Sequence, residues 1–382
     1  MLKKSITLLL LAVLCLQCTA AEAIKTVPQK KTESTRETFT FPALENPQSW
    51  SMVIVPDIQT YIKQIENQGI LDMMLAWIVR RKKEMNIRQV LFTGDLVYYN
   101  DTWRVVPADG IGMGRMTDLI AREQWEATSR LLKRLDGQLP YVLCTGNHDY
   151  GSRSAENRKT WFNHYFPTDR NPLTREQLLE CAPNAFGDKT LETSAYEFTA
   201  PHPDNRKFLV ITLQFAPTDA DLAWAKRVAD EPRFANHIGI VLTHSYIRSN
   251  GNRIQQEKYP LCKQGGNSGE GIFQKLVYPA KNIRMVVCGH VCKPDKWDSC
   301  VGFSMDKNSS GKSVAQMVFN TQAIGGGFSG SGGDGWLRLL EFMPDGKTIK
   351  ARTFSPLFAR SPSTRHLAWK TDERNEFSFV LE

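Results

Sequence analysis

The stretch YVLCTGNHD, residues 141–149, is a short apolar run that ends abruptly in Asn147, His148 and Asp149. Four other stretches share this design, in which a continuous β-rich run stops at Asp, Asn or His. A run that is apolar at nearly every position is typical of a strand buried on both faces. The four stretches are SMVIVPD (51–57), QVLFTGD (89–95), HIGIVLTHS (237–245) and IRMVVCGH (283–290).

Segments with helical spacing lie between these runs. Residues 67–84 and 121–135 carry apolar stripes with a period near that of an α-helix, and residues 218–231 open with a capping-box pattern. Two further strands are expected over 205–215 and 314–322. The alternation of strands and helices predicts an α/β layered fold. Such folds build their sites at the carboxyl ends of the strands.

Polar side chains gather at five of the expected strand ends. Together they offer carboxylate, amide and imidazole groups, with no lysine or serine nucleophile among them. Mixed ligands of this kind suit Zn, Mn or Fe in a hydrolytic site. They exceed what one small cation needs, so we expect two divalent or trivalent metal ions that share a carboxylate. The residues are Asp57, Gln59, Asp95, Asn147, His148, His244 and His290.

The order of these motifs resembles that of the calcineurin-like metallophosphoesterase superfamily. The chain has PDIQ, GDLVYYND, GNHDY, LTHS and CGHVC, where the superfamily has D-x-H, G-D, G-N-H-[DE], H and G-H-x-H. The resemblance runs from residue 51 to about residue 293. The later segment GGDGWLRLLEFMPDG, residues 332–346, is similar to the C-terminal part of exported bacterial members.

The resemblance implies a four-layer α/β/β/α sandwich that hydrolyses phosphomonoesters or phosphodiesters with a metal-bound hydroxide. In the superfamily pattern Asp95 bridges two metal ions and Asp57 binds the first of them. His148 is the general acid, oriented by Asp149, although Asp149 could instead only cap a turn. The ligands of the second ion are Asn147, His244 and His290.

The sequence departs from the superfamily pattern at two positions, and both belong to the first metal. Gln59 replaces the histidine of D-x-H, and its amide oxygen is a weak neutral ligand. Cys292 replaces the last histidine of G-H-x-H. It could be a thiolate ligand that favours Zn or Fe, form a disulfide with Cys300, or stay unbonded. The first site is therefore expected to be the weaker one. The alternative functions are a one-metal phosphoesterase of low activity and a non-catalytic binding protein with the same fold.

The first 23 residues have the features of a bacterial secretory signal peptide. A positive start is followed by an apolar run over residues 6–16 and an A-x-A cleavage pattern at residues 21–23. We therefore expect export to the periplasm or the cell exterior, without a lipid anchor and without a transmembrane segment after cleavage. Residues 24–45 are expected to be a flexible polar leader, and residues 46–382 the metallophosphoesterase domain.

Composition narrows the classes of partner. The chain has 382 residues, of which 41% are hydrophobic, and this is enough for a sizeable core. Its net charge is +8, but the basic residues are scattered, so no nucleic-acid-binding signature is present. The charge favours a phosphorylated small molecule or polymer as substrate. The six cysteines left after signal cleavage contain no C-x-x-C pair, which argues against a zinc ribbon.

Overall fold

The computed structural model describes residues 39–103 and 117–381. The expected signal peptide and most of the expected leader lie outside these residues and stay predictions. Residues 40–382 form one compact unit. Within the described ranges, no helix combines the length and the apolar character needed to cross a membrane. Residues 40–45, which the sequence places in the leader, are attached to this unit; for example, the Glu45 amide donates to Glu341 Oε1 at 2.8 Å.

The first of two sheets contains the first three expected strands. Its order is β13-β12-β11-β1-β2-β3, with β14 also paired to β12. β1, β2 and β3 are parallel, whereas β11 runs antiparallel to β1. The strands are β1 (Trp50–Val55), β2 (Ile87–Phe92), β3 (Tyr141–Leu143), β11 (Leu337–Phe342), β12 (Thr348–Phe354), β13 (Trp369–Lys370) and β14 (Phe377–Val380).

The second sheet contains the remaining expected strands. Its order is β4-β5-β6-β7-β8-β10-β9, and the run from β6 through β7 and β8 to β10 is parallel. The strands are β4 (Leu178–Pro183), β5 (Lys189–Thr199), β6 (Lys207–Thr212), β7 (Ile238–Leu242), β8 (Ile283–Cys288), β9 (Val301–Lys307) and β10 (Ser313–Phe319).

Aromatic side chains join the two sheets face to face. Trp50 of β1 stacks on Phe342 of β11 at 4.1 Å between ring centroids. Phe208 of β6, in the other sheet, meets both rings edge-on at 5.2 and 5.5 Å. These large buried rings form the core between the sheets.

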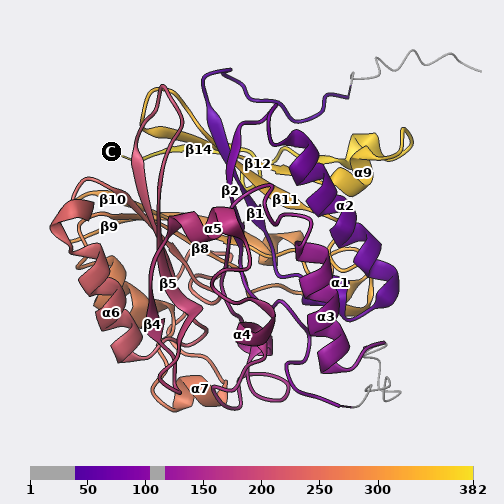
Figure 1. Ribbon diagram of the computed structural model, residues 1–382. Coiled ribbons are helices and arrows are strands. Elements are labelled where there is room, and N and C mark those ends of the chain that lie inside the picture. Colours follow the sequence, from indigo (N-terminus) through magenta and orange to yellow (C-terminus); the bar gives the residue numbers. More distant parts are fainter. Residues whose placement is uncertain (1–38, 104–116, 382) are drawn as a thin grey trace, which may run out of the picture. The chain divides into compact units, whose positions relative to one another are not determined.

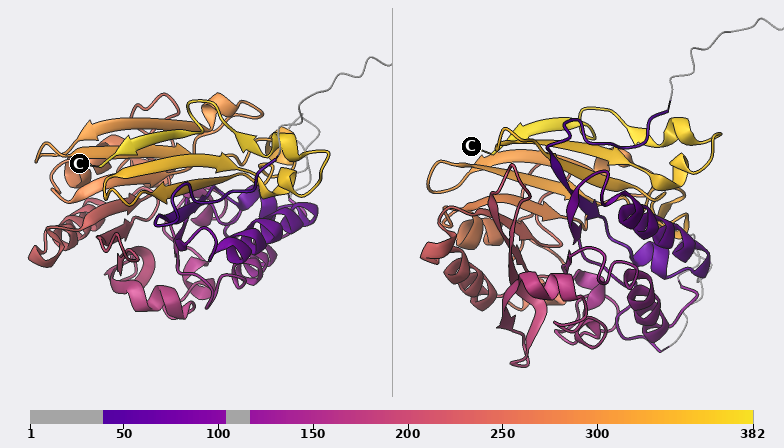
Figure 2. Two further views of the ribbon diagram at one scale, coloured as in Figure 1. Left: turned by 90° about the horizontal axis from the view of Figure 1, so that it is seen from above. Right: turned by 45° about the horizontal axis from the view of Figure 1, so that its top comes forward.

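Helices cover the two outer faces. Figures 1 and 2 show α2 and α3 outside the first sheet and α6 outside the second. Trp77 of α2 packs on Phe354 of β12 at 5.2 Å, and Leu222 and Val228 of α6 share a core with Leu209 of β6. The expected α/β fold with two sheets is confirmed. The longer helices are α2 (Ile65–Arg81), α3 (Ala121–Leu132) and α6 (Asp219–Ala229).

Shorter helices lie within the loops. The α-helical ones are α1 (Gln59–Ile62), α4 (Phe162–Tyr165), α5 (Pro172–Gln177), α7 (Pro260–Lys263), α8 (Gly269–Ile272) and α9 (Pro356–Ala359). A π-helical turn covers Phe273–Val277. The 3-10 turns are Asn147–Asp149, Pro232–Phe234, Trp297–Ser299, Gly327–Ser329 and Arg365–Leu367.

Several expected helices and strands extend further at their C-terminal ends than the observed ones. The helix expected over 67–84 ends at Arg81, and the chain then turns through Asn86, whose φ is +45°. The capping box at Thr218 is formed, since its hydroxyl accepts from the Asp221 amide at 3.2 Å. The strands stop before their polar ends, because the ligand residues leave the sheet: Asp95 and His290 have φ of +48° and +72°.

Candidate metal centre

The candidate ligands lie in the loops that follow five parallel strands. Asp57 and Gln59 follow β1, and Asp95 follows β2. Asn147 follows β3 at the end of the same sheet, whereas His244 and His290 follow β7 and β8 of the other sheet. The two sheets are stacked so that these carboxyl ends meet, and all six side chains are buried or nearly so. The structure therefore brings together residues that are up to 233 positions apart in the chain.

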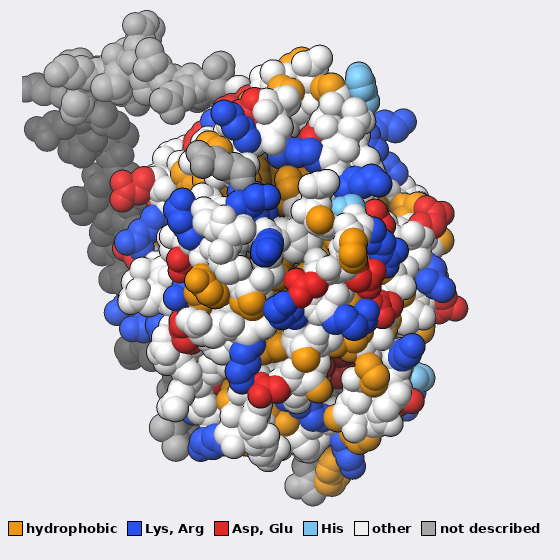
Figure 3. Space-filling model, turned by 90° about the vertical axis from the view of Figure 1, so that its left-hand side faces the viewer, with side chains coloured by type: hydrophobic (Ala, Val, Ile, Leu, Met, Phe, Trp, Pro, Cys, Tyr) orange, Lys and Arg blue, Asp and Glu red, His pale blue; other side chains and the backbone are white. Residues whose placement is uncertain are grey.

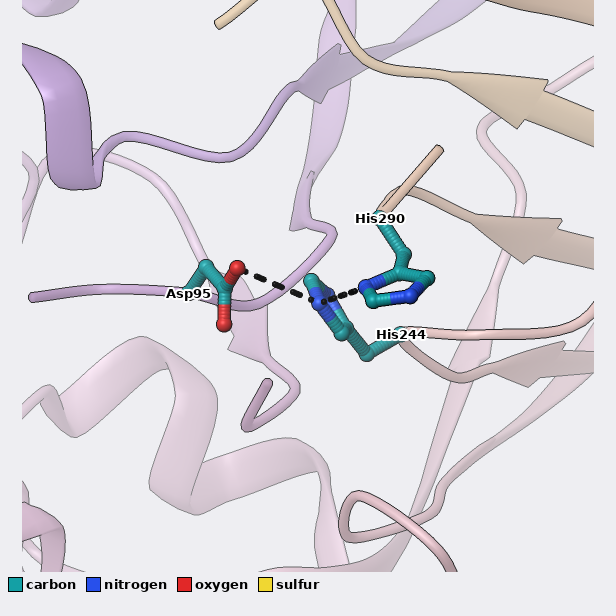
Figure 4. Close-up of side chains that lie close together, drawn as sticks. All are labelled: Asp95, His244 and His290. Carbon is teal, nitrogen blue, oxygen red and sulfur yellow. Dashed lines mark hydrogen bonds and ion pairs between the residues drawn. The ribbon is translucent and has the colours of Figure 1, made fainter. Parts of the chain in front are cut away.

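Three potential ligand atoms surround Nε2 of His244, which is the fourth. Its Nε2 lies 3.3 Å from Asp95 Oδ2, 3.1 Å from His290 Nδ1 and 3.1 Å from Asn147 Oδ1. Figure 4 shows the Asp95 carboxylate and the His290 ring directed at this nitrogen from opposite sides. One ligand atom each of Asp95, His244 and His290 lies within 4.8 Å of the others. Carboxylate, amide and imidazole donors this close fit a single divalent cation.

In each histidine, the ring nitrogen that points away from the cluster (the outer nitrogen) lies beside a hydrogen-bond acceptor. His244 Nδ1 donates to the carbonyl oxygen of Thr93 at 2.8 Å. His290 Nε2 lies 3.2 Å from the carboxylate of Glu257. A proton on the outer nitrogen leaves the lone pair of the inner nitrogen free for a cation. The imidazoles are thus oriented as metal ligands usually are.

Two buried carboxylates give the centre a strong negative field. Burial raises the pKa of Asp57 to about 7, although the nearby His244 lowers it. Burial also acts to raise the pKa of Asp95, but His244 and His148 outweigh it and hold that pKa below its ordinary value. Burial lowers the pKa of His244, yet Asp95 and Asp57 together raise it to about 10. The two carboxylates therefore demand positive charge beside them, which a metal cation supplies.

Two of the residues expected to bind the first metal, Gln59 and Asp57, lie beside the cluster. Gln59 Nε2 donates to Asp95 Oδ2 at 2.9 Å, and Gln59 Oε1 is buried with no hydrogen-bond partner in the part of the chain that the structure describes. A buried amide oxygen without a donor is costly unless something else binds it, and a cation fits that need. Asp57 is already well engaged: Oδ1 accepts from Thr93 Oγ1 at 2.7 Å, and Oδ2 accepts from Asn320 Nδ2 at 2.7 Å.

Cys292 lines the same cavity as the ligand cluster, and its thiol is free. Burial raises the pKa of this thiol, and neighbouring Cys300 and Asp57 add to the effect. The neutral thiol is a poor ligand, so Cys292 coordinates only if a cation displaces its proton. Cys300 is also a free thiol, and the alternative disulfide between the two is not formed in the structure.

The side chains of His148 and Asp149 are hydrogen-bonded to backbone groups of nearby loops. His148 Nδ1 is hydrogen-bonded to the carbonyl oxygen of Tyr98 at 2.7 Å, and the two rings stack at 5.1 Å. Asp149 instead accepts the backbone amides of Leu96 at 2.8 Å and Gly146 at 2.7 Å. These bonds agree with the alternative in which Asp149 caps a turn, and its orienting role toward His148 stays a prediction. By accepting backbone amides from two parts of the chain, the Asp149 carboxylate fixes the loops that carry Asp95 and Asn147. The backbone carbonyl of Tyr98 orients the His148 ring.

Two glycines of the motifs allow the ligands to approach the backbone. A Cβ on Gly146 would lie 2.1 Å from Asp95 Oδ1, and one on Gly289 would lie 2.1 Å from Asp57 Oδ1. Neither carboxylate could keep its position beside such an atom. The glycines before Asn147 and His290 are therefore required by the close packing of the centre.

A cavity of about 1200 Å³ opens over the centre. Asp95, Asn147, His148 and His290 lie on its wall, and so do four basic side chains. Asp295 and Asp298 also line the cavity, so basic and acidic groups are mixed there. Lys and Arg are likewise interspersed with Asp and Glu on the face drawn in Figure 3. The basic residues of the cavity are Arg248, Lys258, Lys293 and Lys296.

Sequence reasoning missed several residues that hold the ligands. Tyr98 and Thr93 act through backbone carbonyls, for which a sequence carries no signal by residue type. Glu257, Asn320 and Gln322 lie outside the motif blocks, and Gln322 Nε2 reaches Asp57 Oδ2 at 3.4 Å. Asn320 and Gln322 directly follow β10, so their place at a strand end was the one usable signal.

Comparisons with known proteins agree with the motif pattern. Residues 52–294 match the family model described as calcineurin-like phosphoesterase. The chain is 27% identical over 320 residues to the uncharacterized protein YvnB of Bacillus subtilis (strain 168), a match that covers 80% of this chain and 20% of that protein. The chain thus spans about a fifth of the length of this relative.

Two solved structures are similar at low identity. One is a dimetal phosphatase from Danio rerio, which is 11% identical, with 88% of this chain and 100% of that chain covered and a TM-score of 0.48. The other is GAP50, the anchor in the inner membrane complex of Plasmodium, which is 12% identical, with 87% and 89% covered and a TM-score of 0.42.

Proposed function

We propose that this chain, which belongs to the calcineurin-like phosphoesterase family, is a metal-dependent hydrolase of phosphoric esters. The observation that carries the proposal is the convergence of the Asp95, Asn147, His244 and His290 donor atoms beside a cavity whose wall holds His148. A scaffold that only bound another molecule would have no need of this buried and electrostatically costly cluster.

The cluster would hold one ion through Asp95, Asn147, His244 and His290. An ion in the first-metal position would share Asp95 and take Asp57 and the unpartnered oxygen of Gln59, with Cys292 as a further donor. Zn, Mn and Fe suit this donor set. When bound, such ions polarise a phosphoryl oxygen and lower the pKa of water, which makes a nucleophile available at neutral pH. The neutral donors Gln59 and Cys292 would make the first-metal site the weaker of the two.

His148 would supply the proton for the leaving group. The Tyr98 carbonyl accepts the proton of Nδ1, so a second proton can only be carried on Nε2, the other ring nitrogen. When the phosphorus–oxygen bond breaks, Nε2 gives its proton to the leaving oxygen, and solvent later restores it. General acid catalysis of this kind contributes roughly 10²–10⁴-fold to the rate. The stacked Tyr98 ring keeps the imidazole in place.

Basic side chains in the cavity wall would pair with an anionic ester. Arg248, Lys258, Lys293 and Lys296 line the cavity, together with the acidic Asp295 and Asp298. A bound cation would add positive charge there, so the cavity would favour an ester with negative charge. Both phosphomonoesters and phosphodiesters satisfy this requirement, so turnover should be measured with an ester of each kind.

The test uses the full chain freed of metal by a chelator and then reloaded with Mn²⁺, Zn²⁺ or Fe²⁺. We expect metal-dependent turnover of p-nitrophenyl phosphate or bis-p-nitrophenyl phosphate, and loss of that turnover in His148→Ala. His366→Ala, in which an exposed histidine is removed, is the matched control and should behave as wild type. Absence of turnover of both esters with all three metals would refute the proposal.

Metal content separates the two forms of the proposal. About two equivalents of metal per chain support the two-metal enzyme. One equivalent, lost in His244→Ala but not in Asp57→Ala, identifies a one-metal enzyme. No bound metal would leave only a binding protein with this fold.

A further inference from the structure

Glu257 contacts one histidine of the candidate centre and the residue that follows the other, although it belongs to none of the motifs. Its Oε1 lies 3.2 Å from His290 Nε2 and accepts the hydroxyl of Ser245 at 2.7 Å. Ser245 directly follows His244 in the chain. The Glu257 side chain is only 12% exposed. A carboxylate with so little exposure to water is costly unless it is hydrogen-bonded, so these two interactions fix the position of the Glu257 side chain.

The two nitrogens of the His290 ring face different neighbours. Nδ1 points to the cluster and lies 3.1 Å from His244 Nε2, whereas Nε2 points to Glu257. A neutral imidazole carries one proton, and the nitrogen that carries it cannot bind a cation. A carboxylate at Nε2 draws the proton to that side and leaves the lone pair on Nδ1.

We propose that Glu257 is a positioning residue of the metal centre, which fixes the Nε2–H tautomer of His290 and directs its Nδ1 lone pair toward Asp95, Asn147 and His244. The inference rests on the metal site of the proposed function. It adds a residue whose effect on the ion passes through His290 rather than through direct coordination.

The loop that carries Glu257 is built to return it to the site. The chain leaves β7, runs outward, and folds back through an antiparallel bridge between Ile247 and Arg253. The Arg253 guanidinium then binds Glu270 at 2.6 Å and Asp306 at 2.5 Å. The two ion pairs tie the returning limb to a neighbouring helix and to β9. Glu257 is thereby brought back beside the end of β8, the strand next to β7.

The ring of His290 is confined on its other sides as well. Tyr259, two residues after Glu257, meets it edge-on at 5.7 Å. Phe215 lies 6.2 Å from it. His244 has its outer nitrogen held by the Thr93 carbonyl, a backbone group that no substitution removes. His290 depends on a side chain for the same purpose, so its tautomer can be tested by mutation.

The experiment measures the affinity of the metal-free full chain for Mn²⁺ by calorimetry. Glu257→Ala should weaken the tightest Mn²⁺ site by roughly 10–100-fold, the usual effect of losing a partner that orients a histidine ligand. Glu257→Gln keeps an acceptor oxygen and should fall between Ala and wild type. Asp298→Ala removes an acid from the rim of the same cavity without contact to a histidine, and should leave the affinity within about twofold.

A double-mutant cycle with His290→Gln separates positioning from general electrostatics. If Glu257 acts through His290, then Glu257→Ala should cost nothing more once His290 is replaced. An equal loss in both backgrounds, or an affinity of Glu257→Ala within about twofold of wild type, would overturn the inference. Thermal unfolding of each metal-free variant checks that it is folded. If wild type binds none of Mn²⁺, Zn²⁺ and Fe²⁺, the proposed function fails. If wild type binds metal and the Glu257 variants bind it equally well, only the inference about Glu257 fails.

Discussion

Replacing Gln59 by glutamate would bring a second carboxylate into contact with the buried carboxylate of Asp95. Gln59 Nε2 now lies 2.9 Å from Asp95 Oδ2 and donates a hydrogen bond to it. In Gln59→Glu an oxygen takes the place of that nitrogen. Two unit charges at this distance repel by about 6 kcal/mol at an effective dielectric constant of about 20. A cation bound between the two carboxylates makes the net interaction attractive, because both then bind it.

The prediction therefore has two halves. Without metal at pH 8, Gln59→Glu should have a free energy of unfolding roughly 3–6 kcal/mol below that of wild type, since relaxation and partial protonation relieve some of the repulsion. Saturating Mn²⁺ should restore most of the loss, because it binds the folded protein and neutralises the pair. The metal-free penalty should shrink toward pH 5, where one carboxylate takes up a proton.

The assay is urea unfolding followed by circular dichroism, with and without Mn²⁺. Gln89→Glu is the matched control: Gln89 is fully buried in β2, and neither of its side-chain polar atoms has a partner. This control should also lose stability, but Mn²⁺ should not restore it beyond its effect on wild type. The reasoning is refuted if Mn²⁺ stabilises Gln59→Glu no more than Gln89→Glu.

The remaining predictions concern activity and pH. His148→Ala should lower kcat by roughly 10²–10⁴-fold while leaving Mn²⁺ affinity unchanged, and a loss of affinity would contradict its role as a proton donor. Asp95→Asn should cost more activity than Gln59→Ala in the same ester assay, because it removes the donor shared by both ions; equal small effects would speak against a shared ligand. Mn²⁺ affinity should rise about tenfold per pH unit between pH 6 and 9, because the ion must displace the proton of His244, whose pKa burial lowers but Asp95 and Asp57 raise to about 10. A flat profile in calorimetry would show that His244 does not bind the ion.

The sequence determined the layered α/β architecture and most of the candidate ligands. Five apolar runs end in ligand residues, and parallel strands of a layered fold bring their carboxyl ends to one edge. Asp57, Asp95 and His244 could therefore be placed together from the pattern of strand ends alone. Helix limits were less certain, because the last turns of α2 and α3 are set by local hydrogen bonds that the periodicity of apolar residues does not report.

The tertiary structure alone decided what holds those ligands. Asn320 lies 263 residues from Asp57 and bonds it at 2.7 Å, and Glu257 reaches His290 from a loop outside every motif. The Tyr98 carbonyl orients the ring of His148. Contacts of this kind depend on how loops return over the sheet edge and on backbone atoms common to all residues. A pattern of residue types predicts which strand ends meet, but it does not contain the directions in which the neighbouring side chains and carbonyls point.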